Sequence, residues 1–353
     1  MTSPEPLITI LLPVFNAARV LPEALESLEA QSFSAWRCLC LDDGSEDGSL
    51  EVARAFARRD PRFVPIPLPH RGIPLTLNEG LARCESPLVA RMDADDLAAP
   101  GRLAAQLDLL EKTERSWSGA RGEGGVLVAT RIRSFKSDGT PPREGMARYV
   151  SWVNQLLTPE DHRRERYIEA PVAHSSVLCR REVFERGYRD LSFCEDYDLW
   201  LHLLERGARF AKTPEVLLSV RDDADRISRN DRRYSQGALR ACKLEHLLGA
   251  PGPLSSRREV LVWGAGRVGK RWLRELPELG VRVPAAVDLH PRKLGRRIHG
   301  ARVVPPEALR QEWDALRDPF ILVAVGAPGA RDEIRAWLSA ASFVEERDYL
   351  MVA

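Results

Sequence analysis

The stretch LITILLPVF, residues 7–15, is an unbroken apolar run that decides the fold of the first part of the chain. A strand with one face in water alternates apolar and polar residues, so a continuous run predicts a strand buried on both faces. A helical pattern follows at 17–31, where leucines recur at helical spacing. Strand followed by helix is the repeating unit of a parallel sheet with helices on its faces.

The same alternation continues along the chain. Further strands are predicted at 36–45, 62–68, 86–93 and 125–135, with a short one at 174–180. Helical patterns occur at 50–58, 75–83, 103–112, 152–157, 159–167, 195–207 and 232–248. The sequence therefore predicts an α/β fold with a mostly parallel sheet flanked by helices.

A cluster of Gly, Pro and Ser at 249–256, GAPGPLSS, predicts a domain boundary. At 353 residues the chain exceeds the usual size of one domain. Beyond the cluster the alternation restarts with EVLVWGAGRVGKRWLREL at 259–276. We expect a first domain over 1–250 and a small Rossmann-like βαβ domain over 257–353.

Composition limits the classes of partner. The 52 basic and 51 acidic side chains leave a net charge of +1, which gives no overall attraction to nucleic acid. The apolar run near the N-terminus is too short to span a bilayer, so no transmembrane segment is predicted. The six cysteines lack metal-type spacing and suit buried thiols in a reducing compartment. We expect a cytoplasmic protein, either free or peripheral at the inner face of the membrane.

Acidic residues gather where two predicted strands end. Asp42 and Asp43 end one strand, and Asp93, Asp95 and Asp96 follow another in RMDADD. Crowded carboxylates repel one another, and a shared divalent cation bound through oxygen ligands would relieve that repulsion. The alternative is that Asp95 or Asp96 simply caps the helix beginning near residue 100.

Four motifs occur together in the first 222 residues: ITILLPVFN (8–16), LDDGSEDGS (41–49), LNEGLARCESPLVARMDADD (77–96) and CEDYDLWLHLLERG (194–207). In order and spacing they resemble family 2 glycosyltransferases of the GT-A fold. The resemblance implies an inverting, metal-dependent enzyme that moves a sugar, of the hexosyltransferase type, from a nucleoside diphosphate sugar to a hydroxyl group. It also implies a glycan or lipid-linked acceptor and a place in cell-surface polysaccharide or glycolipid biosynthesis.

The resemblance also assigns site residues. It places the nucleobase and ribose against Pro13, Phe15 and Asp43, although Phe15 could instead belong to the core. The family's Asp-X-Asp matches Asp93, near the ribose or metal, and Asp95, a direct ligand of Mg²⁺ or Mn²⁺.

The catalytic base implied by the family is Asp196 of the pair Glu195–Asp196. Acidic residues at a helix N-terminus also complement the helix dipole, which is the alternative reading. His174 matches a position near the diphosphate and would be a metal or phosphate ligand, unless it is structural. Arg71 and Asn78 would complete the nucleotide pocket, or serve as a solvated loop residue and a helix contact.

The second domain carries a glycine motif after its first predicted strand. Gly264, Gly266 and Gly269 have Gly-X-Gly-X-X-Gly spacing, and Asp288 lies nineteen residues beyond. Such a motif binds the pyrophosphate of a dinucleotide such as NAD(P), with the acid on a ribose. The alternative is tight strand-to-helix packing without a ligand.

Two rival functions remain open at this level. The first domain could bind a nucleotide sugar without transferring it, as a sensor or scaffold. The second domain could instead make the chain an NAD(P)-binding oxidoreductase.

Overall fold

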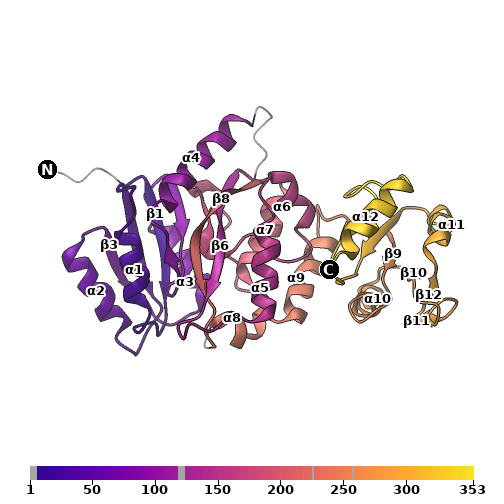
Figure 1. Ribbon diagram of the computed structural model, residues 1–353, viewed down its shortest axis with the longest axis horizontal. Helices are drawn as coiled ribbons and strands as arrows, with labels where there is room; N and C mark the ends of the chain where they lie inside the picture. The colour runs from indigo at the N-terminus through magenta and orange to yellow at the C-terminus, as the bar shows by residue number, and fades with distance from the viewer. Residues whose placement is uncertain (1–5, 118–123, 225, 257) are drawn as a thin grey trace. The chain divides into compact units, whose positions relative to one another are not determined.

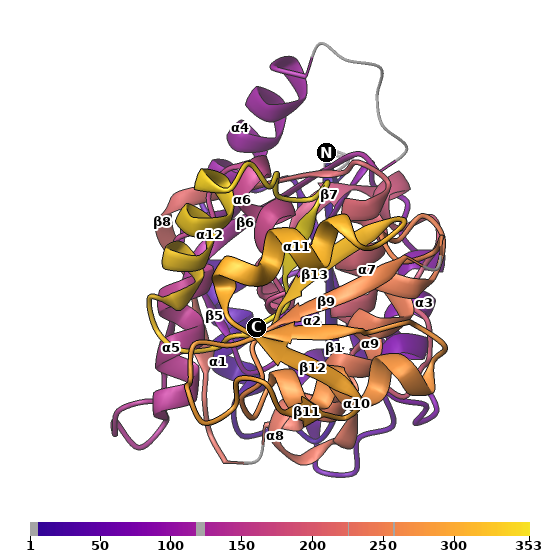
Figure 2. The ribbon, with the colours of Figure 1, turned by 90° about the vertical axis from the view of Figure 1, so that its right-hand side faces the viewer.

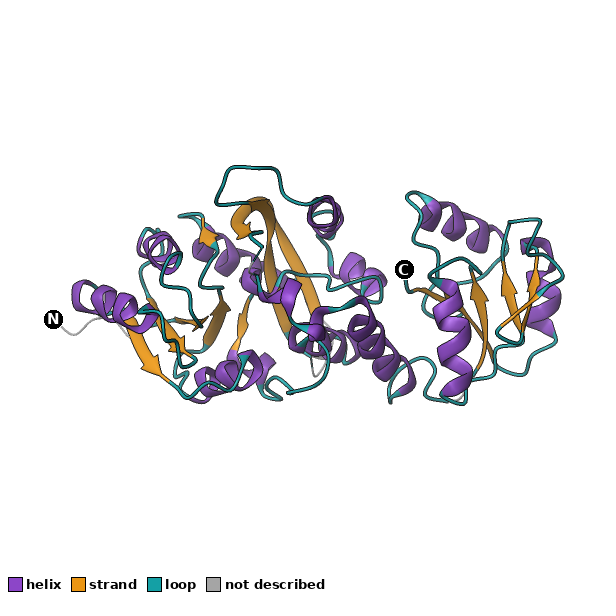
Figure 3. Ribbon diagram, turned by 90° about the horizontal axis from the view of Figure 1, so that it is seen from below, coloured by secondary structure: helices purple, strands orange, loops and turns teal. Residues whose placement is uncertain are grey.

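The computed structural model describes residues 6–117, 124–224, 226–256 and 258–353. The chain forms two compact units (Figure 1). The first comprises Met1–Arg163 and Ala170–Leu239, and the second comprises Arg164–Glu169 and Arg240–Ala353. Each unit has its own sheet, and helices flank the strands in each (Figure 3).

The sheet of the first unit has eight strands in the order β3-β2-β1-β4-β7-β6-β8-β5. Strands β3, β2, β1 and β4 are parallel neighbours, as are β6 and β8. Strand β7 pairs antiparallel with β4 and with β6, and β5 pairs antiparallel with β8. The strand bounds are β1 Ile8–Val14, β2 Trp36–Asp42, β3 Phe63–Pro67, β4 Leu88–Arg91, β5 Leu97–Ala98, β6 Val126–Phe135, β7 Leu178–Arg180 and β8 Arg209–Arg221.

Every residue of β1 is buried, as the unbroken apolar run predicts. Ile8, Ile10 and Leu12 pack into a core on one face of the sheet, beneath the first, second and fourth helices. Leu11 packs into the core on the opposite face, with residues of the third and seventh helices.

The helices named so far and those that follow have these bounds: α1 Leu21–Glu29, α2 Ser49–Arg59, α3 Ile73–Ala82, α4 Arg102–Arg115, α5 Glu144–Val153, α6 Pro159–Glu165, α7 Glu195–Glu205, α8 Ile227–Asn230 and α9 Gln236–Leu248. Short 3₁₀ turns occur at η1 His174–Ser176, η2 Arg181–Phe184 and η3 Arg232–Tyr234. The mixed α/β fold with one large sheet agrees with the GT-A prediction for this part of the chain.

The second unit has six strands in the order β11-β12-β10-β9-β13-β14. All neighbours are parallel except β11, which pairs antiparallel with β12. Strands β9, β12 and β13 are labelled in Figure 2. The elements are β9 Glu259–Trp263, α10 Gly269–Glu278, β10 Ala285–Val287, β11 Arg297–Ile298, β12 Ala301–Val304, η4 Pro306–Ala308, α11 Leu309–Asp314, β13 Pro319–Val323, α12 Ala330–Ala340 and β14 Tyr349–Met351.

In the described part of the chain, each helix is too short or too polar to cross a lipid bilayer. All six cysteines are buried.

Candidate functional site

The site lies at the carboxyl edge of the first sheet. Because β1, β2 and β4 are parallel neighbours, the residues that follow them emerge at one edge, where ligands of such sheets bind. This edge receives Asp42 and Asp43 from β2 and the Asp93–Asp96 turn from β4. The first turn of α7 brings Asp196 close enough to Asp93 for their charges to interact.

Asp93, Asp95 and Asp96 form a crowded carboxylate cluster, with one oxygen from each within 4.8 Å of the others. Burial, followed by the charge of its neighbours, raises the pKa of Asp95 to about 8. Burial and the charge of Asp93 raise the pKa of Asp96 to about 6. One oxygen of Asp96 accepts a hydrogen bond from Arg221 N at 3.1 Å, while its Oδ2 is buried without a hydrogen-bond partner among the described residues.

These aspartates do not cap the following helix. Helix α4 begins at Arg102 after Gly101, and the side chain that accepts from its first turn is Gln31, whose Oε1 lies 3.1 Å from Leu103 N. The capping interpretation of Asp95 and Asp96 therefore does not explain the cluster. Three carboxylates with an unsatisfied buried oxygen are a donor set that fits a hard divalent cation.

Glu195 and Asp196 open α7, which follows Cys194. Glu195 is fully buried, whereas Asp196 is partly exposed. Burial and then the charge of Asp196 raise the pKa of Glu195 to about 7, and burial raises that of Asp196 to about 6. A carboxylate with a pKa near neutrality and access to solvent is suited to accept a proton.

Arg91 interacts by charge with both the aspartate cluster and the acidic pair, and it was not among the residues predicted from the sequence. Its side chain is 2% exposed and forms an ion pair with Asp93. Its charge counteracts burial and lowers the pKa of both Glu195 and Asp196. The sequence signal was a lone arginine in the apolar strand immediately before DADD.

His174 is buried beside the acidic pair. Its Nε2 lies 2.9 Å from the Tyr188 hydroxyl and its Nδ1 lies 3.7 Å from Glu195 Oε1. Burial, followed by the charge of Arg91, holds the pKa of His174 well below its usual value, so the ring is neutral. The Tyr234 hydroxyl, also absent from the sequence prediction, lies 3.0 and 2.9 Å from the two oxygens of Glu195.

The edge beyond β1 and β2 presents an aromatic surface beside Asp43. Phe15 is 40% exposed and stacks on the His70 ring, with centroids 4.2 Å apart and an interplanar angle of 22°. This exposure argues against a core role for Phe15. The Asp43 carboxylate accepts hydrogen bonds from the backbone N–H groups of Arg71 and Gly72, each at 2.9 Å.

Pro13, Arg71 and Asn78, also expected at the nucleotide pocket, differ in burial and in the partners of their side chains. Pro13 is buried within β1, opposite Leu41. The Arg71 guanidinium lies 3.4 Å from Glu79 at the surface. The Asn78 side chain donates to Tyr188 O and accepts from Tyr188 N, each at 2.8 Å, so it joins α3 to the chain preceding α7.

The glycine motif of the second unit connects β9 to α10. A Cβ on Gly269 would lie 1.7 Å from Gly264 O, and one on Gly264 would lie 2.9 Å from Ala324 O. Gly264 also has a φ of +112°, which side-chain-bearing residues rarely adopt. Gly266, in contrast, has open space around it. Packing alone therefore explains the first and third glycines.

Asp288, at the end of β10, is held by its own unit. Its carboxylate accepts from Ala265 N at 2.9 Å, His290 N at 2.8 Å and Lys293 Nζ at 2.8 Å. Burial raises its pKa, but these hydrogen bonds outweigh burial and lower it below the usual value.

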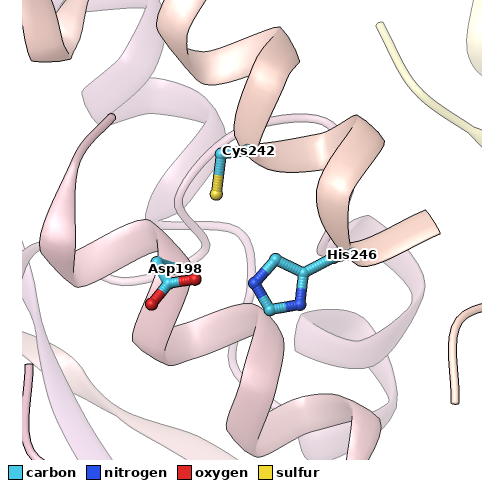
Figure 4. Close-up of side chains that lie close together, drawn as sticks. All are labelled: Asp198, Cys242 and His246. Carbon is cyan, nitrogen blue, oxygen red and sulfur yellow. The ribbon is translucent and has the colours of Figure 1, made fainter. Parts of the chain in front are cut away.

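Figure 4 shows three further polar side chains. Asp198 lies on α7, where it pairs with Arg189 and lies 3.4 Å from Arg186, so its charge is compensated within the first unit. Cys242 and His246 lie four residues apart on α9 and leave the helix on the same side.

Comparison with known proteins places the first unit in a large family. The chain matches the model of glycosyl transferase family 2 over residues 9–187. An uncharacterized glycosyltransferase of Haemophilus influenzae is 30% identical over 240 residues, which cover 67% of this chain and 83% of that protein. The amylovoran biosynthesis glycosyltransferase AmsE of Erwinia amylovora is 29% identical over 227 residues, covering 63% and 78%.

A solved structure shares the fold. The structure of Staphylococcus aureus TarS residues 1–349 in complex with UDP-GlcNAc superposes with a TM-score of 0.53, covering 71% of this chain and 69% of that one. At 14% sequence identity this likeness concerns the fold alone.

Proposed function

We propose, from the premise that this chain belongs to glycosyl transferase family 2, that its first unit transfers a sugar from a nucleoside diphosphate sugar to a hydroxyl group of a glycan or lipid-linked acceptor. Relatives such as AmsE are named for polysaccharide biosynthesis, which supports a similar pathway. The observation that carries the proposal is the aspartate cluster lying beside the acidic start of α7, with a buried arginine between them.

Asp95 and Asp96 would hold the cation, Mg²⁺ or Mn²⁺, together with Asp93. When bound, such an ion offsets the charge of a diphosphate and stabilises it as a leaving group. Arg91 would restrain Asp93 beside the cluster through their ion pair. His174 contacts Glu195 and Tyr188, so we assign it to the support of the acidic pair rather than to the ion.

Asp196 would act as the base. Its Oδ1 accepts a hydrogen bond from Tyr197 N at 2.7 Å, which leaves Oδ2 to take the proton of the acceptor hydroxyl. The deprotonated oxygen then attacks the anomeric carbon as the bond to the diphosphate breaks on the opposite face. One direct displacement inverts the anomeric configuration without a covalent sugar intermediate.

Phe15, Pro13 and Asp43 would form the base and ribose subsite. The exposed Phe15 ring offers a stacking surface for a nucleobase. Asp43 is fixed by the backbone of Arg71 and Gly72, so its carboxylate is already oriented when the nucleotide arrives. Asn78 would act indirectly, by holding Tyr188.

For the second unit we propose a structural or interaction role. The packing of Gly264 and Gly269 and the internal hydrogen bonds of Asp288 support this role over dinucleotide binding. Calorimetric titration with NAD and NADP tests it, since measurable binding by either dinucleotide would overturn the assignment.

A screen of nucleotide sugars tests the main proposal. Uridine, guanosine and thymidine diphosphate sugars should be added with MnCl₂, and the shift in unfolding temperature recorded, because a ligand of the folded state stabilises it. We expect one class to stabilise the wild-type chain but not Asp95→Asn, and to release nucleoside diphosphate. Stabilisation without release in the presence of any acceptor would favour a sensor or scaffold, and no stabilisation by any donor would contradict the proposal.

A further inference from the structure

The hydroxyl of Tyr234 contacts the buried carboxylate of Glu195. Its oxygen lies 3.0 Å from Oε1 and 2.9 Å from Oε2, although the two residues are 39 positions apart in the chain. A hydroxyl that donates to a buried carboxylate forms a charge-assisted hydrogen bond, which is stronger than a neutral one. Glu195 directly precedes Asp196 in the first turn of α7.

The other contacts of Glu195 are weaker. His174 Nδ1 is 3.7 Å from Oε1, which exceeds ordinary hydrogen-bond length, and the His174 ring is turned through Nε2 toward Tyr188. The charge of Arg91 acts on Glu195, but the ion pair of Arg91 is with Asp93. Among the hydrogen bonds described here, the Tyr234 hydroxyl is therefore the close partner that restrains the Glu195 side chain.

Tyr234 is itself held in place by local interactions. It ends the 3₁₀ turn η3, whose beginning is capped by the Asp231 side chain accepting from Arg233 N at 2.8 Å. The Arg233 guanidinium returns to Asp231 at 2.7 Å and lies 4.0 Å from Asp190, shortly before α7. The turn thus presents the tyrosine hydroxyl to α7 from a fixed direction.

The end of β8, thirteen residues before Tyr234, contacts the aspartate cluster. Arg221 donates from its backbone N to Asp96 Oδ1 at 3.1 Å and from its Nε to Asp95 O at 2.9 Å. The same part of the chain therefore supports the proposed cation side through Arg221 and the proposed base side through Tyr234.

We propose that Tyr234 is a positioning residue for sugar transfer, which acts through the Glu195 carboxylate to fix the first turn of α7 and hence the direction of the Asp196 carboxylate. This inference rests on the proposed function. Tyr234 does not touch the reacting atoms in this account. Its loss should reduce the chemical step and leave donor binding nearly unchanged, because the donor is assigned to the aspartate cluster and the Phe15 surface and not to Tyr234 or Glu195.

The variant Tyr234→Phe removes the hydroxyl and keeps the ring. We expect kcat to fall about tenfold while KM for the donor stays within about twofold. The matched control is Tyr149→Phe, which removes a part-buried hydroxyl that donates to Ala170 O at 3.2 Å in the same unit. The control should keep the kcat of the wild type, and both variants should unfold at similar temperatures.

A double-mutant cycle tests whether the tyrosine acts through Glu195. If it does, Tyr234→Phe should add little to the loss caused by Glu195→Gln. Independent, multiplicative losses in the double variant would overturn the route through Glu195. An unchanged kcat, or a raised donor KM with unchanged kcat, in Tyr234→Phe would overturn the positioning role.

Hydrogen exchange supplies a readout that does not depend on activity. The amides at the start of α7 should exchange faster in Tyr234→Phe than in the wild type and in Tyr149→Phe. Equal exchange in all three would contradict the inference even if the wild type is an active transferase. An inactive wild type with faster exchange in Tyr234→Phe would remove the proposed function and leave the restraint on α7 standing.

Discussion

Asp95 and Asp288 both follow a parallel strand at the carboxyl edge of a sheet, yet their carboxylates have opposite surroundings. Asp95, after β4, lies with Asp93 and Asp96, and its pKa is raised to about 8 by burial and by its neighbours' charge. Asp288, after β10, accepts two backbone hydrogen bonds and pairs with Lys293, and its pKa is lowered.

The contrast separates a sheet edge with crowded, buried carboxylates from a turn whose carboxylate is already paired. The first unit keeps unfavourable charge at its sheet edge, and perturbed carboxylates of this kind concentrate at functional sites. The second unit satisfies its acidic residue with its own backbone and a lysine. The substitutions that follow test this contrast, in order of decreasing expected effect.

The largest effect is expected from removing the proposed base. Asp196→Asn should lower kcat about 1000-fold, because general base catalysis typically contributes a factor of this order. Donor affinity, measured by calorimetry, should change little. Asp288→Asn in the second unit serves as the control and should retain the kcat of the wild type. An Asp196→Asn enzyme with more than about a tenth of the normal kcat would refute the assignment of the base.

Replacing the buried arginine Arg91 should destabilise the first unit. Arg91→Met leaves Asp93 and the acidic pair without their guanidinium, and breaking a buried ion pair costs about 3 to 5 kcal/mol in the free energy of unfolding. The control is Arg59→Met, whose ion pair with Glu29 is exposed and should contribute less than about 1 kcal/mol. Urea unfolding measures the free energy of unfolding of both variants. Equal decreases would show that the buried Arg91 pair contributes no more than the exposed Arg59 pair.

Replacing Asp95 or Asp288 by asparagine should change the free energy of unfolding in opposite directions. In metal-free buffer at pH 8, Asp95→Asn should stabilise the protein by about 1 to 2 kcal/mol, because it relieves crowded buried charge. Asp288→Asn should destabilise it by about 1 kcal/mol, because hydrogen bonds to a carboxylate are lost. Urea unfolding in EDTA checks both, and stabilisation by Asp288→Asn would contradict the account.

The pH dependence follows from the same pKa values. The pKa of Asp95 is about 8 in the folded chain, above the ordinary 3.8. The folded state therefore favours the protonated carboxyl, and its stabilising contribution is fully present below pH 3.8 and is lost as pH rises toward 8. The benefit of Asp95→Asn should therefore grow between pH 5 and pH 8. The folded pKa of Asp288 is lowered, so its contribution is present above 3.8 and is lost as pH falls through the folded pKa. Unfolding at a series of pH values would detect a reversed trend.

The smallest effect is expected at the aromatic surface. Phe15→Ala should weaken donor binding about fivefold, because stacking of a base on an aromatic ring contributes on the order of 1 kcal/mol. The fold should be unaffected, since Phe15 is 40% exposed. Leu289→Ala, at an exposed leucine of the second unit, is the control and should leave donor affinity unchanged. Unchanged affinity in Phe15→Ala would remove this ring from the nucleotide site.

Local patterns predicted the first half of the larger sheet well. The apolar runs gave β1 to β4 and the helical spacing gave α2 to α4, because both signals lie within a few neighbouring residues. The helix predicted at 17–31 is shorter, Leu21–Glu29, and the one predicted at 152–157 is instead α5, Glu144–Val153. The helix predicted at 232–248 divides into the turn η3 and α9.

Long-range structure was harder to predict. Strand β8, Arg209–Arg221, was missed, since it mixes polar and apolar residues and shifts register against β6 near Arg131. Its last residue, Arg221, bonds Asp96, a contact that no local pattern indicates.

The residues of the candidate site also fall into those that local patterns mark and those that depend on distant partners. The acidic residues of the candidate site were predicted from the sequence because they lie at strand and helix ends, which local patterns mark. Arg91 and Tyr234 were not found, because their importance comes from burial and from partners distant in the chain. A cation inside an apolar strand is a signal that could have indicated Arg91.

We propose that the aspartate cluster of the first unit, and not the acidic turn of the second, holds a divalent cation. The decisive measurement is a calorimetric titration of Mn²⁺ into the wild type, Asp95→Asn and Asp288→Asn, with the best-stabilising nucleoside diphosphate present. We predict a single Mn²⁺ per wild-type chain, an affinity at least about tenfold weaker in Asp95→Asn, and no change in Asp288→Asn. Equal Mn²⁺ affinity in the wild type and in Asp95→Asn would contradict the claim.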